Sequence, residues 1–326
     1  MRRLNGRRIA RRLWVGGPDG ERGAVAVAMA LLVPLLLAAA ALAVDSAAQW
    51  MARNQVITGA DSAALAQAMD CAVDNCGSSD NVKAKISYYF ITNNKGSKLA
   101  SLQPGTGWIQ WDGNQRATRS QGTWEIHNLF GSAVGVTSTP LTVESMARWT
   151  GAPTALADLP LAVSLCAYDS TLHGLGSTSS TTTLTLHTDT AGPSCTVPGG
   201  GTASGTTVLT SGSSGCRQRS TVADQLGVAT TQPADCTSSY LDGLVGSDIW
   251  VPVYDQSTAT SAHVYAYAAM HVTSVSTASP ASVTGYWTYG ARQINTPDTV
   301  PTAPDLGARA VFLWDPDTWQ GVRCPC

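Results

Sequence analysis

An uninterrupted run of 22 uncharged residues, from Gly23 to Val44, constrains this chain more than any other feature. As an α-helix such a run spans roughly 33 Å, which matches the hydrocarbon core of a bilayer at about 30 Å. Its leucines and valines favour insertion by roughly 3 to 6 kcal/mol, which offsets the cost of the single proline, Pro34. The sequence therefore predicts a transmembrane helix over residues 23–44.

Charge is distributed unevenly on the two sides of this run. Residues 1–22 hold seven arginines against two acidic residues, a net charge of +5, whereas residues 45–326 hold 13 basic and 20 acidic residues, a net charge of −7. Basic residues that flank a membrane helix stay on the cytoplasmic side. We expect a basic cytoplasmic head over residues 1–22 and an extracytoplasmic chain from Asp45 onward.

A cleaved signal peptide is the alternative. Ala41-Leu42-Ala43 fits a small-residue cleavage site, and the arginine-rich start fits the basic region that precedes the apolar core of a signal peptide. The apolar run exceeds the roughly 7 to 15 residues usual for such a core, and the helical pattern continues beyond the candidate site. Length therefore favours a membrane anchor.

The segment that follows the apolar run is also predicted to be helical. Residues 45–70 contain no proline and are rich in Ala, Gln, Met and Leu, which are good helix formers. Ala60, Ala63 and Ala64 recur with Val56 at helical spacing, and together they form a face of small side chains. Such a face suits the close approach of a partner helix. Packing against the chain's own outer domain is an equal alternative.

Residues 21–68 resemble the N-terminal segment of TadE/TadG-like proteins of Flp pilus assembly, the tight-adherence system. Members typically carry Glu-Arg-Gly before the membrane helix, an Asp directly after it, and an Arg-containing helix that ends in an Ala-Asp-Ala-Ala-Ala-Leu-Ala-type motif. The matching positions here are Glu21, Arg22, Gly23, Asp45, Arg53, Ala60, Asp61, Ala63, Ala64, Leu65 and Ala66. Looser similarity to longer TadG-like members extends over about 120 further residues, including the VPVYD and HVYAYAAMHVTSV segments.

The resemblance implies a structural or assembly role in a tight-adherence pilus or secretion system. It implies the membrane and other pilus or envelope assembly proteins as partners, reached through the membrane helix and the helix that follows. The residues it implicates in assembly are Gly23, Asp45, Arg53, Ala60, Asp61, Ala63 and Ala64.

Beyond about residue 120 the sequence is typical of β structure. Residues 263–275 alternate between two sets of side chains over more than nine positions, which is the clearest strand pattern in the chain. Further strands are predicted at 180–188, 248–255, 283–290 and 310–314, and residues 81–94 are compatible with a short helix. The expected fold class is α+β, with a mixed α/β segment at 71–150 and a mainly β, Ser/Thr/Gly-rich domain at 151–326.

Residues 171–220 differ most in composition from the rest. Thirty-one of these fifty residues are Ser, Thr or Gly, so large side chains for a core are scarce. We expect short edge strands joined by long turns, with PGGG at 198–201 as a loop tip. A flexible or glycosylated stalk is the alternative.

All eight cysteines follow the apolar run, in the part expected to lie in an oxidising compartment, which favours disulfides. We expect Cys71 to pair with Cys76, Cys195 with Cys216, and Cys166 with Cys236. Cys324 and Cys326 are left to bond to the domain, to another chain or to each other.

No catalytic motif is present, and the five histidines are scattered along the chain. His263 and His271 share a strand face, but eight residues of strand separate them by about 25 Å, too far to share a metal ion. We expect no catalytic residue, no metal and no cofactor, and the net charge of −2 argues against a nucleic-acid partner.

The preferred function is therefore non-enzymatic. The alternative is an anchored or secreted module that binds polysaccharide or a cell-wall ligand through exposed Trp and Tyr, although the ten tryptophans also suit a small β core.

Overall fold

The computed structural model describes residues 18–78, 84–85, 88–89, 116–171, 180–197, 202–210, 215–295 and 303–314. Residues 1–17 of the predicted head, the predicted loop tip at 198–201, and Cys324 and Cys326 lie outside the described residues. The chain divides into two compact units. The first holds residues 1–55, 97–101 and 123–141, and the second holds residues 56–96, 102–122 and 142–326.

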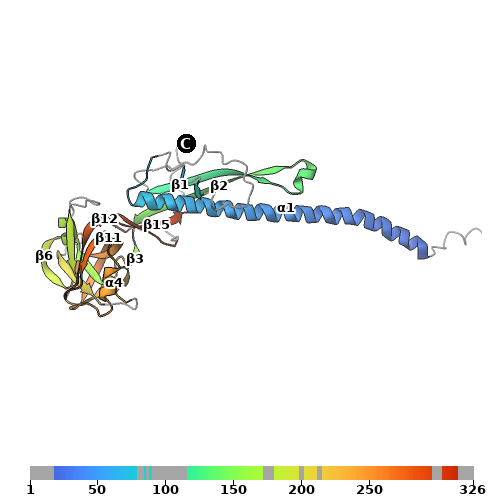
Figure 1. Cartoon of the computed structure of the whole chain (residues 1–326). Coiled ribbons are helices and arrows are strands. Elements are labelled where there is room, and N and C mark those ends of the chain that lie inside the picture. The colour runs from blue at the N-terminus through green and yellow to red at the C-terminus, as the bar shows by residue number, and fades with distance from the viewer. Residues whose placement is uncertain are drawn as a thin grey trace, which may run out of the picture. The chain divides into compact units, whose positions relative to one another are not determined.

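Helix α1 (Pro18–Ala72) is one continuous helix of 55 residues, drawn in blue in Figure 1. It contains both the predicted apolar span and the predicted helix after it, and Pro34 lies inside it without ending it. Every side chain from Val25 to Ala40 is exposed. The helix from Val25 onward is long and apolar enough to cross a membrane. The prediction of one long, apolar N-terminal helix is confirmed.

The end of α1 follows from local backbone geometry. The Asp70 carbonyl oxygen accepts hydrogen bonds from the N–H groups of Val73 and Asn75, and Asp74 has a φ of 59°. A residue in this left-handed conformation commonly stops a helix, because it turns the chain back toward the last carbonyl groups. Cys71 pairs with Cys76 across the same turn.

A four-stranded sheet packs on the C-terminal part of α1. Its order is β1-β2-β15-β13, and its strands are β1 (Ala117–His127), β2 (Ser138–Gly151), β15 (Ala308–Trp314) and β13 (Gly290–Gln293). A 3-10 helix, η1 (Gly131–Val134), lies between β1 and β2. Ala147, Trp149 and Val311 from the sheet join Ala64 and Ala68 of the helix in one apolar cluster.

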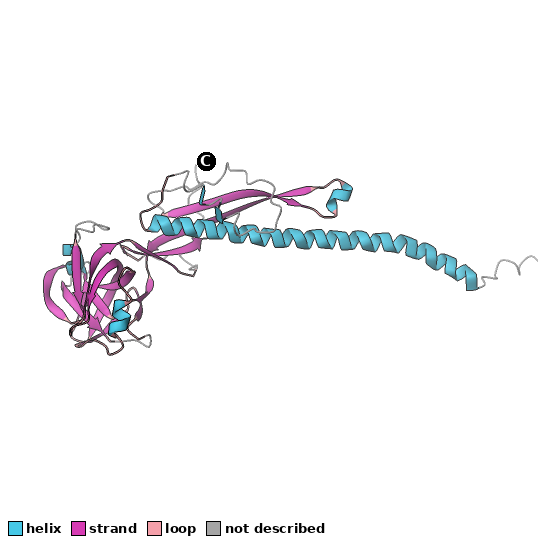
Figure 2. Cartoon of the chain, in the orientation of Figure 1, coloured by secondary structure: helices cyan, strands magenta, loops and turns pink. Residues whose placement is uncertain are grey.

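Apart from α1, the described chain is mostly strand, drawn in magenta in Figure 2. The second, larger sheet has nine strands, and β3 with β8 forms a separate pair. The strands are β3 (Thr154–Ala157), β4 (Leu161–Ser164), β5 (Thr181–Thr185), β6 (Asp189–Thr196), β7 (Thr202–Leu209), β8 (Gln218–Thr221), β9 (Gln225–Ala229), β10 (Asp248–Ser257), β11 (Ser261–Ser276), β12 (Ser282–Thr288) and β14 (Asp305–Leu306). Two short helices, α3 (Leu165–Thr171) and α4 (Ser238–Asp242), interrupt them.

Five strands of the larger sheet close into a ring. Pairing runs from β10 to β4, β7, β9 and β11, and β11 pairs back onto β10. A closed ring leaves no free strand edge in that part of the sheet. The rest of β11 extends past the ring and pairs with β12, which in turn pairs with β5.

The two central strands of this sheet, β10 and β11, are buried on both faces. One face, with Val251, Val253 and Met270, belongs to one apolar cluster, while Trp250 and Tyr267 on the other face belong to a second. Burial on both sides explains why β10 is almost continuously apolar in sequence.

The structure confirms a strand in each of the five segments predicted to be strands: β5, β10, β11, β12 and β15 lie in them. In the expected helix at 81–94, the four described residues, 84–85 and 88–89, are helical. The boundary placed at residue 150 falls within β2, which pairs with β15 from the far end of the chain. Long-range pairing of this kind leaves no local signal in composition.

Three cysteine pairs lie at disulfide distance, and two of them differ from the expected pairing. Cys71 pairs with Cys76 as expected, but Cys166 pairs with Cys195 and Cys216 pairs with Cys236. The predicted pairs Cys195–Cys216 and Cys166–Cys236 are wrong. The reason is that Cys166 lies on α3, which packs beside β6 and so brings it against Cys195.

Candidate functional site

Helix α1 changes its surface along its length. From Val25 to Ala40 all side chains are exposed and apolar, and after Asp45 one side becomes buried while the other stays exposed. The buried positions recur every three or four residues, as expected for one face of a helix. We call this face the buried stripe; it consists of Val56, Gly59, Ala60, Ala63, Ala64, Gln67, Ala68, Cys71 and Ala72.

Asp45 lies at the transition between these two surfaces and is only 8% exposed. Its Oδ1 accepts hydrogen bonds from the backbone N–H groups of Leu129 and Phe130, at 2.9 and 3.1 Å. Its Oδ2 accepts from Gly131 at 2.7 Å, and also from Phe130 at 3.2 Å. One carboxylate thus holds three successive amides of the segment between β1 and β2.

These contacts determine the acidity of Asp45. Desolvation is the largest single influence and raises the pKa of the carboxyl, but the hydrogen bonds from Phe130, Gly131 and Leu129 together outweigh it. The net pKa is therefore below its ordinary value, because backbone donors stabilise the ionised form. At neutral pH the carboxylate is charged and bound.

A second polar contact one turn further along α1 supports the first. Gln49 Nε2 donates to Asn128 Oδ1 at 2.8 Å, and Asn128 Nδ2 donates to the Val136 carbonyl oxygen at 3.1 Å. The Asn128 backbone N–H also donates to the Thr137 carbonyl oxygen at 3.0 Å. We call residues 128–137 the tip: it is fastened to α1 by Asp45 and Gln49 and closed on itself by Asn128.

The small-residue face lies against the chain's own strand. Ala60, Ala63 and Ala64 are each 1% exposed. Ser120 Oγ on β1 donates to the Ala60 carbonyl oxygen at 2.8 Å, and Thr118 Oγ1 donates to that of Ala64 at 3.0 Å. Hydroxyl groups reach helix carbonyl oxygens only when the backbones approach closely, which alanines permit. Of the two alternatives left open by the sequence, the structure therefore shows packing within the chain.

The other residues implicated by the resemblance differ in exposure. Arg53 is exposed and Asp61 is half-buried. Gly23 lies in the apolar part of α1. Asp45 and the three alanines are therefore buried by contacts within the chain, whereas Arg53 is available to other molecules.

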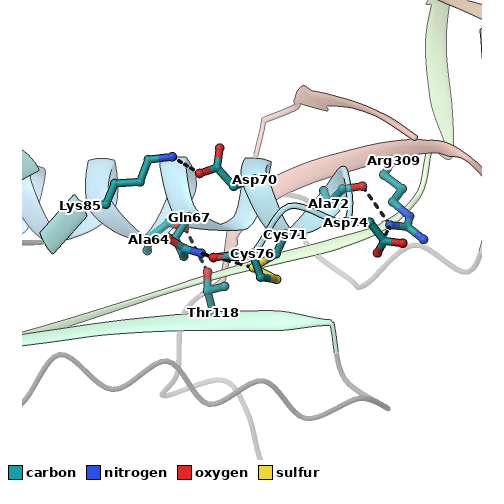
Figure 3. Close-up of a disulfide and its surroundings, with 10 residues drawn as sticks. All are labelled: Ala64, Gln67, Asp70, Cys71, Ala72, Asp74, Cys76, Lys85, Thr118 and Arg309. Carbon is teal, nitrogen blue, oxygen red and sulfur yellow. Dashed lines mark hydrogen bonds and ion pairs between the residues drawn. A yellow bond between two sulfur atoms is a disulfide. The ribbon is translucent and has the colours of Figure 1, made fainter. Parts of the chain in front are cut away.

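Two side chains that the sequence did not single out hold the C-terminal end of α1, one to the turn that follows it and one to the sheet (Figure 3). Gln67 Nε2 donates to the Cys76 carbonyl oxygen at 2.9 Å, beside the Cys71–Cys76 disulfide. Arg309 on β15 donates from Nη1 to the Ala72 carbonyl oxygen at 2.9 Å. The local signal for Arg309 was weak, because it is a lone charge in an apolar strand.

Arg309 is itself held by several partners. Its Nε donates to Asp305 Oδ2 at 2.9 Å, and its guanidinium carbon lies 3.9 Å from the centre of the Tyr289 ring. Asp305 also binds Arg116. This buried cation therefore links β15, the end of α1 and the segment before β1.

The histidines singled out in the sequence are each paired with a carboxylate. His263 Nδ1 lies 2.6 Å from Asp255 Oδ1, and His271 Nδ1 lies 2.7 Å from Asp248 Oδ1. Among the described residues, no group of three or more His, Cys, Asp or Glu side chains could hold a metal ion.

The described tryptophan side chains divide into three that are buried, one that is half-buried, Trp314, and one that is exposed. Trp149, Trp250 and Trp287 are at most 4% exposed, so they fill the β core, whereas Trp50 on α1 is 68% exposed. The described β strands thus present little exposed indole surface for stacking on a sugar.

No family model, curated protein or solved structure matches this chain.

Proposed function

We propose that the chain is a membrane-anchored, non-enzymatic protein of the bacterial cell envelope, with the apolar part of α1 in the bilayer and the disulfide-bonded β domain outside. The observation that carries this is the side-chain exposure from Val25 to Ala40, where no described side chain is covered by the protein. An exposed apolar surface of this size is stable only when lipid or another apolar surface covers it.

The helix geometry favours an anchor over a cleaved signal. Helix α1 runs unbroken through Ala41-Leu42-Ala43, and Asp45, two residues later, is already bound to the tip. Cleavage after Ala43 would leave Asp45, whose carboxylate binds the tip, beside a new N-terminus. The seven arginines of residues 1–22, against Arg53 alone among the basic residues of 45–70, support an orientation with the N-terminus in the cytoplasm.

Within this class, we propose an assembly role like that implied by the resemblance to TadE/TadG-like proteins. The ordered landmarks from Glu21 to Ala66 support it. Because the small-residue face is occupied, contacts with other envelope proteins would use the apolar part of α1 and its exposed side after Asp45, which includes Arg53.

Anchoring is tested by fractionating cells of the native host. We expect the protein in membranes after alkaline carbonate extraction, with an intact mass that retains residues 1–44 and a β domain that external protease removes. Recovery of a soluble protein with a new N-terminus near Val44 would refute the anchor and favour a secreted binding module.

The assembly role is tested by native electrophoresis of membranes solubilised in mild detergent. We expect the protein in a complex larger than its own 33.9 kDa, and we expect Arg53→Glu to weaken that complex severalfold. Gln55→Glu, a matched change at another exposed position of α1, serves as the control. A protein that migrates as a monomer in both variants and in the wild type contradicts the assembly role but not the anchor.

A further inference from the structure

The tip carries apolar side chains that the protein leaves uncovered. Leu129 is 67% exposed, Phe130 is 50% exposed and Val136 is 51% exposed. They lie within a stretch of eight residues, in a segment from 126 to 143 that contains no Asp, Glu, Lys or Arg. Three large, exposed apolar side chains on one uncharged turn mark it as a surface that another apolar surface can cover.

The contacts of Asp45 place this turn at one specific level of α1. Asp45 directly follows the predicted membrane span, and its carboxylate binds the backbone of Leu129, Phe130 and Gly131 at 2.7 to 3.2 Å. The backbone that carries the apolar side chains of the tip is therefore attached at the level where the exposed apolar surface of α1 ends. Val44, the last residue of that surface, is 46% exposed.

The backbone of the tip is prepared for a poorly hydrated environment. The N–H groups of residues 128–131, 133, 135 and 136 all donate hydrogen bonds, either to Asp45 or within the tip. An unpaired N–H group is costly to remove from water, whereas a paired one is not. These seven N–H groups can thus enter the boundary of a bilayer without losing hydrogen bonds to solvent.

An exposed aromatic residue lies at a similar level on the helix. Trp50 is 68% exposed and lies five residues beyond Asp45, roughly 7.5 Å along the axis. Tryptophan is enriched at the headgroup level of membranes, where its ring meets apolar chains and its N–H meets water. Trp50 and the tip therefore have the side chains expected of one interfacial layer.

We propose that the tip is a second membrane contact, in which Leu129, Phe130 and Val136 enter the outer leaflet beside α1. This proposal rests on the anchored orientation proposed above. The bilayer is the favoured occupant because the apolar side chains of the tip continue the apolar surface of the helix. Asp45 acts as the positioning residue: its carboxylate holds the tip at the boundary without itself touching lipid.

The test uses the full-length protein in vesicles of phosphatidylethanolamine and phosphatidylglycerol at a ratio of about three to one. Benzoylphenylalanine replaces Phe130, and in separate samples Leu36 or Val245; irradiation is followed by mass spectrometry of lipid adducts. Leu36, 65% exposed, reports the helix itself, and Val245, 47% exposed on the β domain, is the matched control for an exposed apolar side chain elsewhere. We expect the Phe130 sample to give at least about five times the adduct yield of the Val245 sample.

The outcomes separate the two proposals. Adducts at Leu36 but none above the Val245 yield at Phe130 would overturn the tip contact and leave the anchor intact. Absence of adducts at both Leu36 and Phe130 would overturn the anchor as well. Adducts at Phe130 to another protein in native membranes, without lipid adducts, would make the tip a protein-docking surface and would also overturn the proposal.

A second variant tests the role of Asp45. We expect Asp45→Ala to lower the Phe130 adduct yield by more than half and to leave the Leu36 yield unchanged, because the tip is no longer held at the boundary. An unchanged Phe130 yield would show that the tip reaches lipid without Asp45 and would refute its positioning role.

Discussion

Asp45 shows how one side chain can determine the conformation of a distant segment. Its three backbone donors lie at least 84 residues away in sequence, and they lower the pKa of the carboxyl despite its desolvation. Because the pKa of the folded state is below 3.8, the contribution of Asp45 to stability is present above that value and is lost as pH falls through the folded pKa.

The first prediction concerns hydrogen exchange in the tip. At neutral pH, Asp45→Asn should raise amide exchange in residues 129–131 by about tenfold, because a neutral amide oxygen is a weaker acceptor than a carboxylate. In the wild type, the same amides should lose protection as pH falls through the folded pKa of Asp45, which lies below its ordinary value, once intrinsic rates are corrected for pH. Exchange in β11 is the internal control, and equal protection of the tip in both proteins would contradict the prediction.

Arg309 is a buried cation with a carboxylate, an aromatic ring and a helix carbonyl oxygen as partners. Arg309→Met should lower the free energy of unfolding by about 2 to 4 kcal/mol, since it removes one member of a buried ion pair. Arg116 still pairs with Asp305 in this variant. The destabilisation is therefore smaller than that caused by leaving a buried carboxylate without any partner. Arg309→Lys keeps the charge and should cost less.

Urea unfolding in detergent, followed by circular dichroism, measures this difference. If the Met and Lys variants unfolded together with the wild type, Arg309 would not hold the end of α1.

At the scale of elements, the central contact is between the small-residue face of α1 and β1. Ala64→Leu adds three carbon atoms where the side chain is 1% exposed and Thr118 approaches the Ala64 carbonyl oxygen. We expect a loss of about 1 to 3 kcal/mol in the free energy of unfolding, typical of overpacking. Ala47→Leu, on an exposed turn of the same helix, should change stability by less than about 0.5 kcal/mol. Equal stability of the two variants would show that the face is not packed.

This contact also changes how mutations in the face are interpreted. Bulky residues at Ala60, Ala63 or Ala64 would disturb the chain's own sheet before they reached a partner. Loss of an assembly in such variants would therefore not identify a helix partner, whereas a change at the exposed Arg53 can.

The disulfides provide a further test at this scale. Peptide mapping without reduction should recover Cys166 with Cys195 and Cys216 with Cys236. Replacing both cysteines of a pair by alanine should cost about 3.5 kcal/mol for Cys166–Cys195, with a separation of 29 residues, and about 2 kcal/mol for Cys71–Cys76, with a separation of 5. A mapped Cys195–Cys216 bond would contradict the fold around α3.

The elements that could be predicted are those whose signal is local. The apolar run, the helix formers after Asp45 and the alternation in residues 263–275 each define a secondary structure within a short window. The closed ring, the pairing of β2 with β15, and the disulfide partners depend on contacts between distant segments. Asp45 was singled out from the sequence, but its partners were not, because backbone N–H groups carry no residue-specific pattern.

At the scale of the whole molecule, the membrane topology of the chain links the positive charge of the head to the disulfides of the β domain. In the anchored orientation proposed above, the seven arginines of residues 1–22 bias the head toward the cytoplasm, and the β domain lies in an oxidising compartment in which its disulfides can form. If both statements hold, disulfide formation reports the orientation of the helix. A change confined to the head should then alter the redox state of cysteines more than a hundred residues away.

The prediction is tested by replacing Arg2, Arg3, Arg7, Arg8, Arg11 and Arg12 together with glutamine. The head then keeps Arg22 with Asp19 and Glu21, and the first outer turns keep Arg53, so the excess of basic residues inside disappears. We expect the disulfide-bonded fraction, measured by thiol alkylation and non-reducing electrophoresis in the native host, to fall severalfold. Lysine at the same six positions preserves the charge and should preserve oxidation. If the glutamine variant remained fully oxidised and open to external protease, the arginine head would not set the orientation, and the folding or export of the β domain would have to do so.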